Sequence, residues 1–142
     1  MIEAKNAGFR FLDYKVLSFS YDTPENENNE AIRIDFDPSG IYQQKTGTFT
    51  LQLKFRGTED KEGGNTFMQV KAEAIFKFQD NFPFKDLPDF FYKNSIAILF
   101  PYLRAFISNM TLQANAPIVI LAIMNLGSLE QPLKDSTTCI EE

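Results

Sequence analysis

A chain of 142 residues fits one domain, since a domain of this length buries about 70% of the surface that its unfolded chain exposes. Its net charge of −5, with Lys and Arg scattered along the chain, argues against nucleic-acid binding, which needs a basic patch to neutralise phosphates. The single cysteine, Cys139, excludes an internal disulfide and favours a reducing compartment.

The sequence also argues against a membrane or secreted protein. Residues 1–10 contain no apolar run typical of a signal peptide. The longest uninterrupted apolar stretch, Ala116–Met124, is far shorter than the ~20 residues that a membrane-spanning helix needs. We therefore expect a cytoplasmic protein without stable membrane insertion.

Aromatic side chains are abundant, with 15 Phe and 5 Tyr but no Trp. Fully burying one such side chain is worth about 1.5–3 kcal/mol. Two interpretations stay open. The rings could all pack the core, or some could line a groove or a subunit interface.

The first half of the chain alternates between apolar and polar residues, as β-strands do. In residues 12–21 the apolar parity changes after Val16, which predicts a bulge or a strand covered on both faces. The polar run 22–30 predicts a loop. Residues 32–36 predict a short, half-buried strand that ends at the turn-forming residues 37–40.

Two longer strands follow. Thr46–Arg56 alternates cleanly, and the loop 57–65 connects it to a strand over Thr66–Phe78. Phe67 and Ile75 are apolar residues on the otherwise polar face of that strand. Four strands joined by polar loops predict an antiparallel meander.

The apolar period then changes to three and four, which predicts an amphipathic helix over residues 99–114 after a helical turn near residues 90–94. Pro101 lacks an N–H group, so the helix either starts near Pro101 or kinks there. Residues 115–117 end the helix, and the apolar residues 117–124 are expected to lie extended against the protein.

From Gly127 onwards, Pro132 and a polar composition predict a frayed tail. Altogether we expect one α+β domain over residues 1–142. It combines a four-stranded antiparallel sheet, a long C-terminal helix packed against that sheet, and a short or truncated second helix. Residues 1–10 and 130–142 are expected to be flexible.

Residues suited to catalysis are scarce. The chain has no histidine, which removes the side chain most often used for proton transfer near neutral pH and the common His-based metal sites. Asp35 and Asp37 share one strand face with Arg33 and fit a solvated surface. The acidic run 59–62 lacks the spacing of a calcium loop. We expect no catalytic residues, no metal site and no cofactor.

The segment Ile98–Arg104 followed by Ile107-Ser108 resembles the helix signature of the SecB family of export chaperones, in which an L-F-P-Y-x-R segment precedes an I-S pair. The resemblance extends over most of residues 15–129, although only this helix signature is specific. The other similar segments are Lys15–Pro24, Arg33–Asp37, Thr66-Phe67 and the apolar run from Ala116-Pro117 to Asn125.

This resemblance implies four antiparallel strands, a long helix, a shorter C-terminal helix and assembly into a homotetramer built as a dimer of dimers. It also implies ATP-independent binding of unfolded or nascent polypeptides in hydrophobic grooves. The groove positions that carry over are Ile34, Phe36, Phe67, Tyr102, Leu126 and Leu129.

The chain departs from the family where export chaperones place acidic residues on the sheet surface to engage the SecA motor. It has Val16, Ser20 and Val70 there, so docking to SecA is not expected. The leading hypothesis is a chaperone for unfolded or exported proteins. The alternative is a specialised SecB-like adaptor or antitoxin chaperone that binds one specific partner, and an enzyme ranks third.

Overall fold

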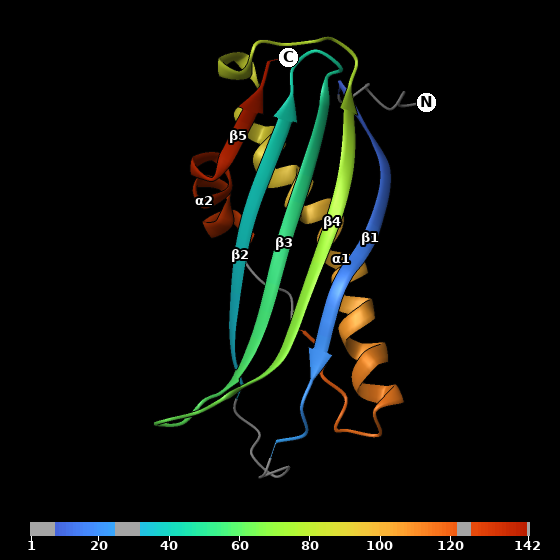
Figure 1. Cartoon of the computed structure of the whole chain (residues 1–142), viewed down its shortest axis with the longest axis vertical. Coiled ribbons are helices and arrows are strands. Elements are labelled where there is room, and N and C mark those ends of the chain that lie inside the picture. Colours follow the sequence, from blue (N-terminus) through green and yellow to red (C-terminus); the bar gives the residue numbers. More distant parts are fainter. Residues whose placement is uncertain (1–7, 25–31, 122–125, 142) are drawn as a thin grey trace, which may run out of the picture.

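The computed structural model describes residues 8–24, 32–121 and 126–141. In it, a five-stranded sheet with strand order β1-β4-β3-β2-β5 carries the helical layer on one face (Figure 1). The strands are β1 (Phe9–Tyr21), β2 (Ile32–Gln43), β3 (Thr48–Glu59), β4 (Thr66–Phe78) and β5 (Thr137–Ile140), and the helices are η1 (Phe84–Asp86), α1 (Asp89–Gln113), η2 (Leu126–Leu129) and α2 (Glu130–Asp135).

Strands β2, β3 and β4 form the expected antiparallel meander, but β1 pairs with β4 rather than with β2, and the sheet is larger than predicted and mixed. The added strand β5 pairs in parallel with β2, beginning with Gly40 opposite Thr137. The sheet therefore has five strands rather than four, and α1 is central in the sequence rather than C-terminal.

The expected flexible tail also needs correction, because residues 130–140 form α2 and β5. Leu133 is fully buried in the core, and the Thr137 hydroxyl donates a hydrogen bond of 2.6 Å to the Leu133 carbonyl oxygen. Pro132 is tolerated because it lies in the first turn of α2, where backbone N–H groups have no helical acceptor. Of the expected flexible N-terminal segment, Phe9 and Arg10 belong to β1, and residues 1–7 lie outside the described ranges.

Strand β2 continues through the predicted turn at residues 37–40. Pro38 opposes Leu53 of β3, whereas β5 begins only at Gly40, so Pro38 lies where β2 is still an outer strand. Gly40 is required for close packing, because a Cβ atom there would lie 2.5 Å from Cζ of Phe49. Strand pairing and close packing thus override the local turn signal.

The parity change in β1 is a bulge, as the sequence indicates. The register against β4 shifts between Val16 and Ser18, and again between Phe11 and Asp13. These shifts keep aromatic side chains at both ends of β1 on the helix-covered face.

Helix α1 starts well before Pro101, and the alternative in which it begins there is wrong. The proline sits inside the helix and removes one backbone hydrogen bond, which costs about 3 kcal/mol in a helix interior. Buried residues on both sides, including Leu99 and Leu103, pack α1 on the sheet. The helix ends as predicted, with Asn115 in the left-handed conformation at φ 56°.

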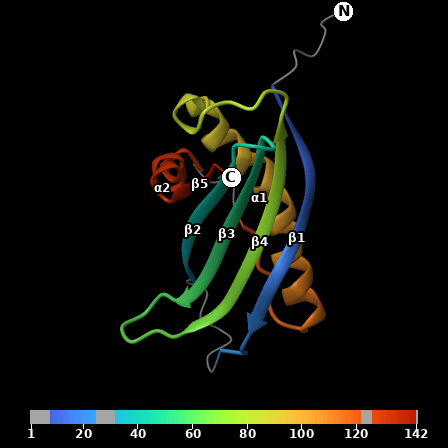
Figure 2. The ribbon, with the colours of Figure 1, turned by 45° about the horizontal axis from the view of Figure 1, so that its top comes forward.

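By length and composition α1 could also span a membrane. In the structure its buried residues instead join those of β3 and β4 in one hydrophobic core. Figure 2 shows α1 running diagonally along the sheet, close to β1 at its C-terminal end. This diagonal course leaves different groups of apolar side chains on the two sides of α1.

Candidate functional site

Four of the predicted groove residues lie on elements that pack together. Ile34 and Phe36 belong to β2, and Leu126 and Leu129 belong to η2; β2 and η2 contact each other, and η2 also contacts α1. All four side chains are partly buried against the core. We call these four residues the β2–η2 cluster.

Phe36 connects this cluster to the long helix. Its ring centroid lies 5.6 Å from that of Phe55 and 6.0 Å from that of Phe100. Phe100 is part of the Leu-Phe-Pro-Tyr motif but was not predicted as a site residue. Its position in that motif, two residues before the predicted Tyr102, was the available signal.

Tyr102 lies apart from the β2–η2 cluster, on the β1 side of α1. Its ring contacts those of Tyr14 and Phe11, at centroid distances of 4.6 Å and 5.6 Å. The side chain remains 41% exposed. The structure therefore does not bring Tyr102 together with Phe36, although only Pro101 separates Tyr102 from Phe100.

The same side of α1 carries a second aromatic pair. Phe19 of β1 and Phe106 of α1 lie 5.1 Å apart, and Phe19 is 61% exposed. We call Tyr14, Phe19, Tyr102 and Phe106 the β1–α1 flank. Because β1 is an outer strand of the described sheet, this flank places exposed aromatic rings beside an unpaired strand edge.

Phe67 occupies a third location and is only 8% exposed. The expectation that it stands on the polar face of its strand is corrected by a register shift at the start of β4, which leaves both Phe67 and Met68 buried. Its ring packs edge-on against Tyr21 at 6.1 Å.

The segment that follows α1 is fixed to the helix by two hydroxyl groups. Ser108 donates a hydrogen bond to the Val119 carbonyl oxygen at 2.9 Å, and the Val119 N–H donates to the Thr111 hydroxyl at 3.0 Å. Ile118 and Ile120 remain 52% and 67% exposed. The rest of the predicted apolar run, residues 122–125, lies outside the described ranges.

The titratable groups with altered pKa values lie at the other end of α1 and at the sheet edge. Burial raises the pKa of Tyr42 and of Tyr92. The hydrogen bond with Asp89 raises the pKa of Lys134. Burial also raises the pKa of the Cys139 thiol, which lowers its thiolate fraction and hence its reactivity. Within the described ranges, no three acidic or cysteine side chains lie where they could hold a metal ion.

The three positions considered for motor docking do not share one surface. Val16 and Val70 lie on the helix-covered face, where Val16 pairs with Ala72 and Val70 is 2% exposed. Only Ser20 belongs to the opposite, open face. Packing on the helix-covered face therefore explains why positions 16 and 70 carry valine rather than an acidic residue.

Comparisons with known proteins agree with the resemblance seen in the sequence. The family model described as preprotein translocase subunit SecB matches residues 17–133. The uncharacterized protein MJ0357 of Methanocaldococcus jannaschii is 28% identical in an alignment of 134 positions, and the match spans 84% of this chain and 81% of that protein. The fold is similar to that of the Mycobacterium tuberculosis SecB-like chaperone Rv1957, with a TM-score of 0.68 and 16% identity over 84% of this chain and 91% of that one. Because the family match spans most of the sequence, this chain belongs to the SecB family.

Proposed function

We propose that the chain is an ATP-independent cytoplasmic chaperone that holds unfolded or nascent polypeptides, acting by binding rather than by catalysis. The observation that carries this proposal is the β2–η2 cluster. Its four apolar side chains are only partly buried, at a place where a strand and a short helix meet. A stretched polypeptide would complete their burial.

Apolar contacts suit such a role physically. Their strength follows the apolar area removed from water and does not depend on direction, so one surface accepts many sequences. Aromatic walls such as Phe36 and Phe100 add large contact area at low cost in side-chain freedom.

The proposal includes assembly into a homotetramer built as a dimer of dimers. The β1–α1 flank supports it, because exposed aromatic rings beside an outer strand are suited to contact with a second copy. Several copies of a weak polypeptide site on one assembly would engage the same client at once and so raise the overall affinity.

A more specialised role is the second candidate. The structure of Rv1957 that this fold resembles contains a ChAD peptide from the antitoxin HigA1 (Rv1956). By analogy, this chain would hold one segment of one partner protein rather than many clients. Affinity purification would separate the two roles, since one stoichiometric partner favours the specialised role and many nascent chains favour the general one.

The direct test is suppression of client aggregation. The purified protein in slight excess over a chemically denatured client should reduce light scattering without ATP. A variant with Phe36→Ser and Leu129→Ser should lose this effect. Ile41→Ser, which changes an apolar residue on the open sheet face that is 41% exposed, serves as the control and should keep it. A monomeric protein without any effect on aggregation would refute the proposal.

A further inference from the structure

The sheet face opposite α1 is left open by the described part of the chain (Figure 1). The strand registers determine which side chains it presents. For example, Asp37 of β2, Lys54 of β3, Lys71 of β4 and Ser18 of β1 lie side by side in one row across the sheet. The β2–η2 cluster is on the other side, because Phe36 packs against Phe55 and Phe100 beneath the sheet.

The open face has a charge opposite to that of the whole chain. Strands β1 to β4 place seven of the 14 basic side chains there, but only four of the 19 acidic ones. The face thus has three more positive than negative charges, whereas the chain has a net charge of −5. The basic residues are Arg10, Lys15, Arg33, Lys54, Arg56, Lys71 and Lys77, and the acidic ones are Asp13, Asp35, Asp37 and Glu73.

The positive charge is concentrated at the centre of the face. Lys54 and Lys71 are directly opposite each other on neighbouring strands, an arrangement of like charges that destabilises a sheet. Arg56 follows Lys54 by two residues on the same face. None of these three side chains makes an ion pair within 4.0 Å with another described residue. An anionic group placed over them would relieve the repulsion.

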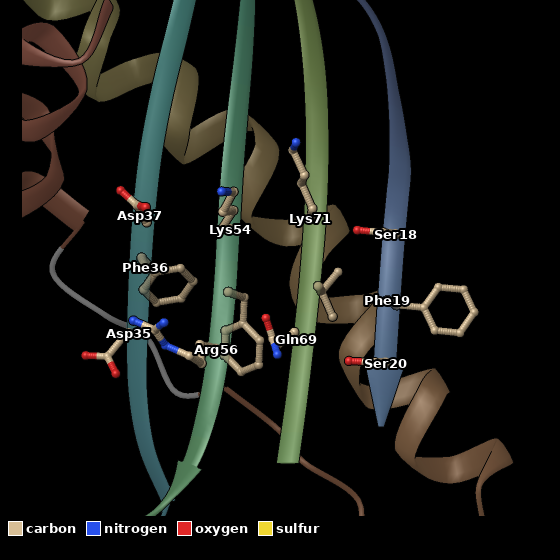
Figure 3. Close-up of a pocket in the computed structure, with 12 residues that line it drawn as sticks. Ser18, Phe19, Ser20, Asp35, Phe36, Asp37, Lys54, Arg56, Gln69 and Lys71 are labelled. Atoms are coloured by element: carbon tan, nitrogen blue, oxygen red, sulfur yellow. The ribbon is translucent and has the colours of Figure 1, made fainter. Parts of the chain in front are cut away.

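A shallow hollow of about 360 Å³ lies over these side chains (Figure 3). Ser18, Ser20 and Gln69 complete its polar lining and can donate hydrogen bonds. Asp35 and Asp37 also border the hollow, but their carboxylates point toward the outer side of β2. The Asp35 carboxylate lies 3.7 Å from Nε of Arg33. Lys54 and Arg56 of β3 and Lys71 of β4 therefore supply the basic part of the lining.

We infer that this open face docks an acidic segment of a partner polypeptide, whose Asp and Glu side chains lie across β3 and β4 over Lys54, Arg56 and Lys71. Complementary charge at such a solvated surface mainly speeds association and selects the partner, and it makes binding sensitive to salt. Of the β2–η2 cluster, Ile34, Leu126 and Leu129 do not border this hollow and Phe36 does, so partner docking and client holding would use largely separate surfaces.

The test is binding of a fluorescent oligoglutamate peptide to the full-length protein, followed by fluorescence anisotropy at low and moderate salt. Binding should weaken about tenfold or more in the variant Lys54→Glu/Lys71→Glu, because the reversed charges repel the peptide. The control Lys85→Glu/Lys93→Glu changes two exposed lysines outside the sheet by the same net charge and should bind as the parent does. Lys54→Arg/Lys71→Arg should also retain binding.

The outcomes separate this inference from the proposed chaperone function. Both charge-reversal variants should still suppress client aggregation, because neither alters the β2–η2 cluster. Absence of oligoglutamate binding to the parent protein would overturn the inference, as would an equal loss of binding in the two charge-reversal variants. A change of oligomeric state in Lys54→Glu/Lys71→Glu alone would also overturn it, because the face would then be an interface between copies of this chain.

Discussion

The rings of Tyr14 and Tyr102 lie 4.6 Å apart with their planes tilted by 31°, which joins the edge strand β1 to the exposed side of α1. Phe100, two residues earlier, instead faces Phe36 on β2. Two residues of the Leu-Phe-Pro-Tyr motif therefore pack on opposite sides of α1, Phe100 toward β2 and Tyr102 toward β1. Under the proposed assembly Tyr102 would contribute to subunit contacts, whereas Phe100 packs against Phe36 of the β2–η2 cluster.

The first prediction concerns self-association through the β1–α1 flank. Replacing Phe19 and Tyr102 by Ala removes two exposed aromatic side chains, 61% and 41% accessible, and should weaken association by about tenfold or more. Native mass spectrometry over a dilution series measures this shift. Ile140→Ala, which shortens an apolar residue on β5 that is 44% exposed, is the control and should leave the oligomeric state unchanged. A tetramer unaffected by the double variant would contradict this assignment.

The second prediction concerns client affinity. Ile34→Ala and Leu129→Ala shorten partly buried side chains of the β2–η2 cluster and should each weaken binding of an unfolded client by about 5- to 30-fold, from ~1–2 kcal/mol of lost apolar contact. Isothermal titration calorimetry with a denatured client measures the affinity of each variant. Tyr102→Ala should change client affinity less at a protein concentration that keeps the assembly intact. A larger loss of client affinity in Tyr102→Ala than in Ile34→Ala and Leu129→Ala would place the client site on the β1–α1 flank.

The third prediction is a loss of stability in alkali. The pKa values of Tyr42 and Tyr92 are raised above 10.0, mainly by burial, and that of Lys134 is raised above 10.5, mainly by its hydrogen bond with Asp89. In the unfolded chain these groups release their protons at lower pH, so the stability they contribute is complete below about pH 10 and falls as pH rises further. Urea unfolding across this range, with tyrosinate absorbance followed in parallel, measures the effect. Tyr92→Phe should reduce the slope; an unchanged free energy of unfolding above pH 10 would contradict the prediction.

The fourth prediction compares two glycines in the sheet. Gly40→Ala places a methyl group 2.5 Å from the Phe49 ring and 2.8 Å from the Thr137 hydroxyl, and should lower the free energy of unfolding by about 1–3 kcal/mol. Gly57→Ala meets its nearest atom, Cβ of Met68, at 3.6 Å and should change stability by less than about 1 kcal/mol. Chemical denaturation measures the free energy of unfolding of both variants. Equal values for Gly40→Ala and Gly57→Ala would show that the residues around Gly40 adjust freely to the added methyl group.

The fifth prediction tests the connection between α1 and the segment that follows it. Thr111→Val leaves the Val119 N–H without its acceptor and should destabilise the protein by about 1–3 kcal/mol. Thr111→Ser keeps the hydroxyl group and loses one methyl, so a loss of about 0.8 kcal/mol is expected. Hydrogen exchange at the Val119 amide should rise only in the valine variant. Faster exchange in both variants would indicate that side-chain packing, not the hydroxyl, fixes this segment.

Much of the sheet could be predicted because alternation reports which strand face is buried. The limits of β4, Thr66 and Phe78, are the predicted ones, and the parity change in β1 is a bulge. The errors lie where tertiary contacts outweigh local signals. Pro38 and Pro101 suggested breaks, yet pairing with β3 and packing on the core carry the chain through both. The polar run at residues 134–138 and Pro132 hid the strand β5, which forms by pairing with β2.

The candidate site was predictable only in part. The resemblance placed Ile34, Phe36, Leu126 and Leu129 on elements that do pack together. It could not separate Tyr102 from them, because the side of a helix that a residue occupies depends on how the helix crosses the sheet. The clustering of basic residues on the open face was also hidden, since it requires the registers of four strands.

The short strand β5 has a consequence for how many copies can join. It covers β2 from Gly40 to Gln43, and the remainder of that border carries Pro38, which cannot donate a hydrogen bond, and the charged Asp35 and Asp37. Only the β1 border of the described sheet is long enough for a neighbour to extend it, although the pairing of β1 with β4 contains two register shifts. If two molecules pair through their β1 edges, neither has a second long edge left for another molecule. Strand addition would then stop at a dimer, and an open-ended fibre would be disfavoured.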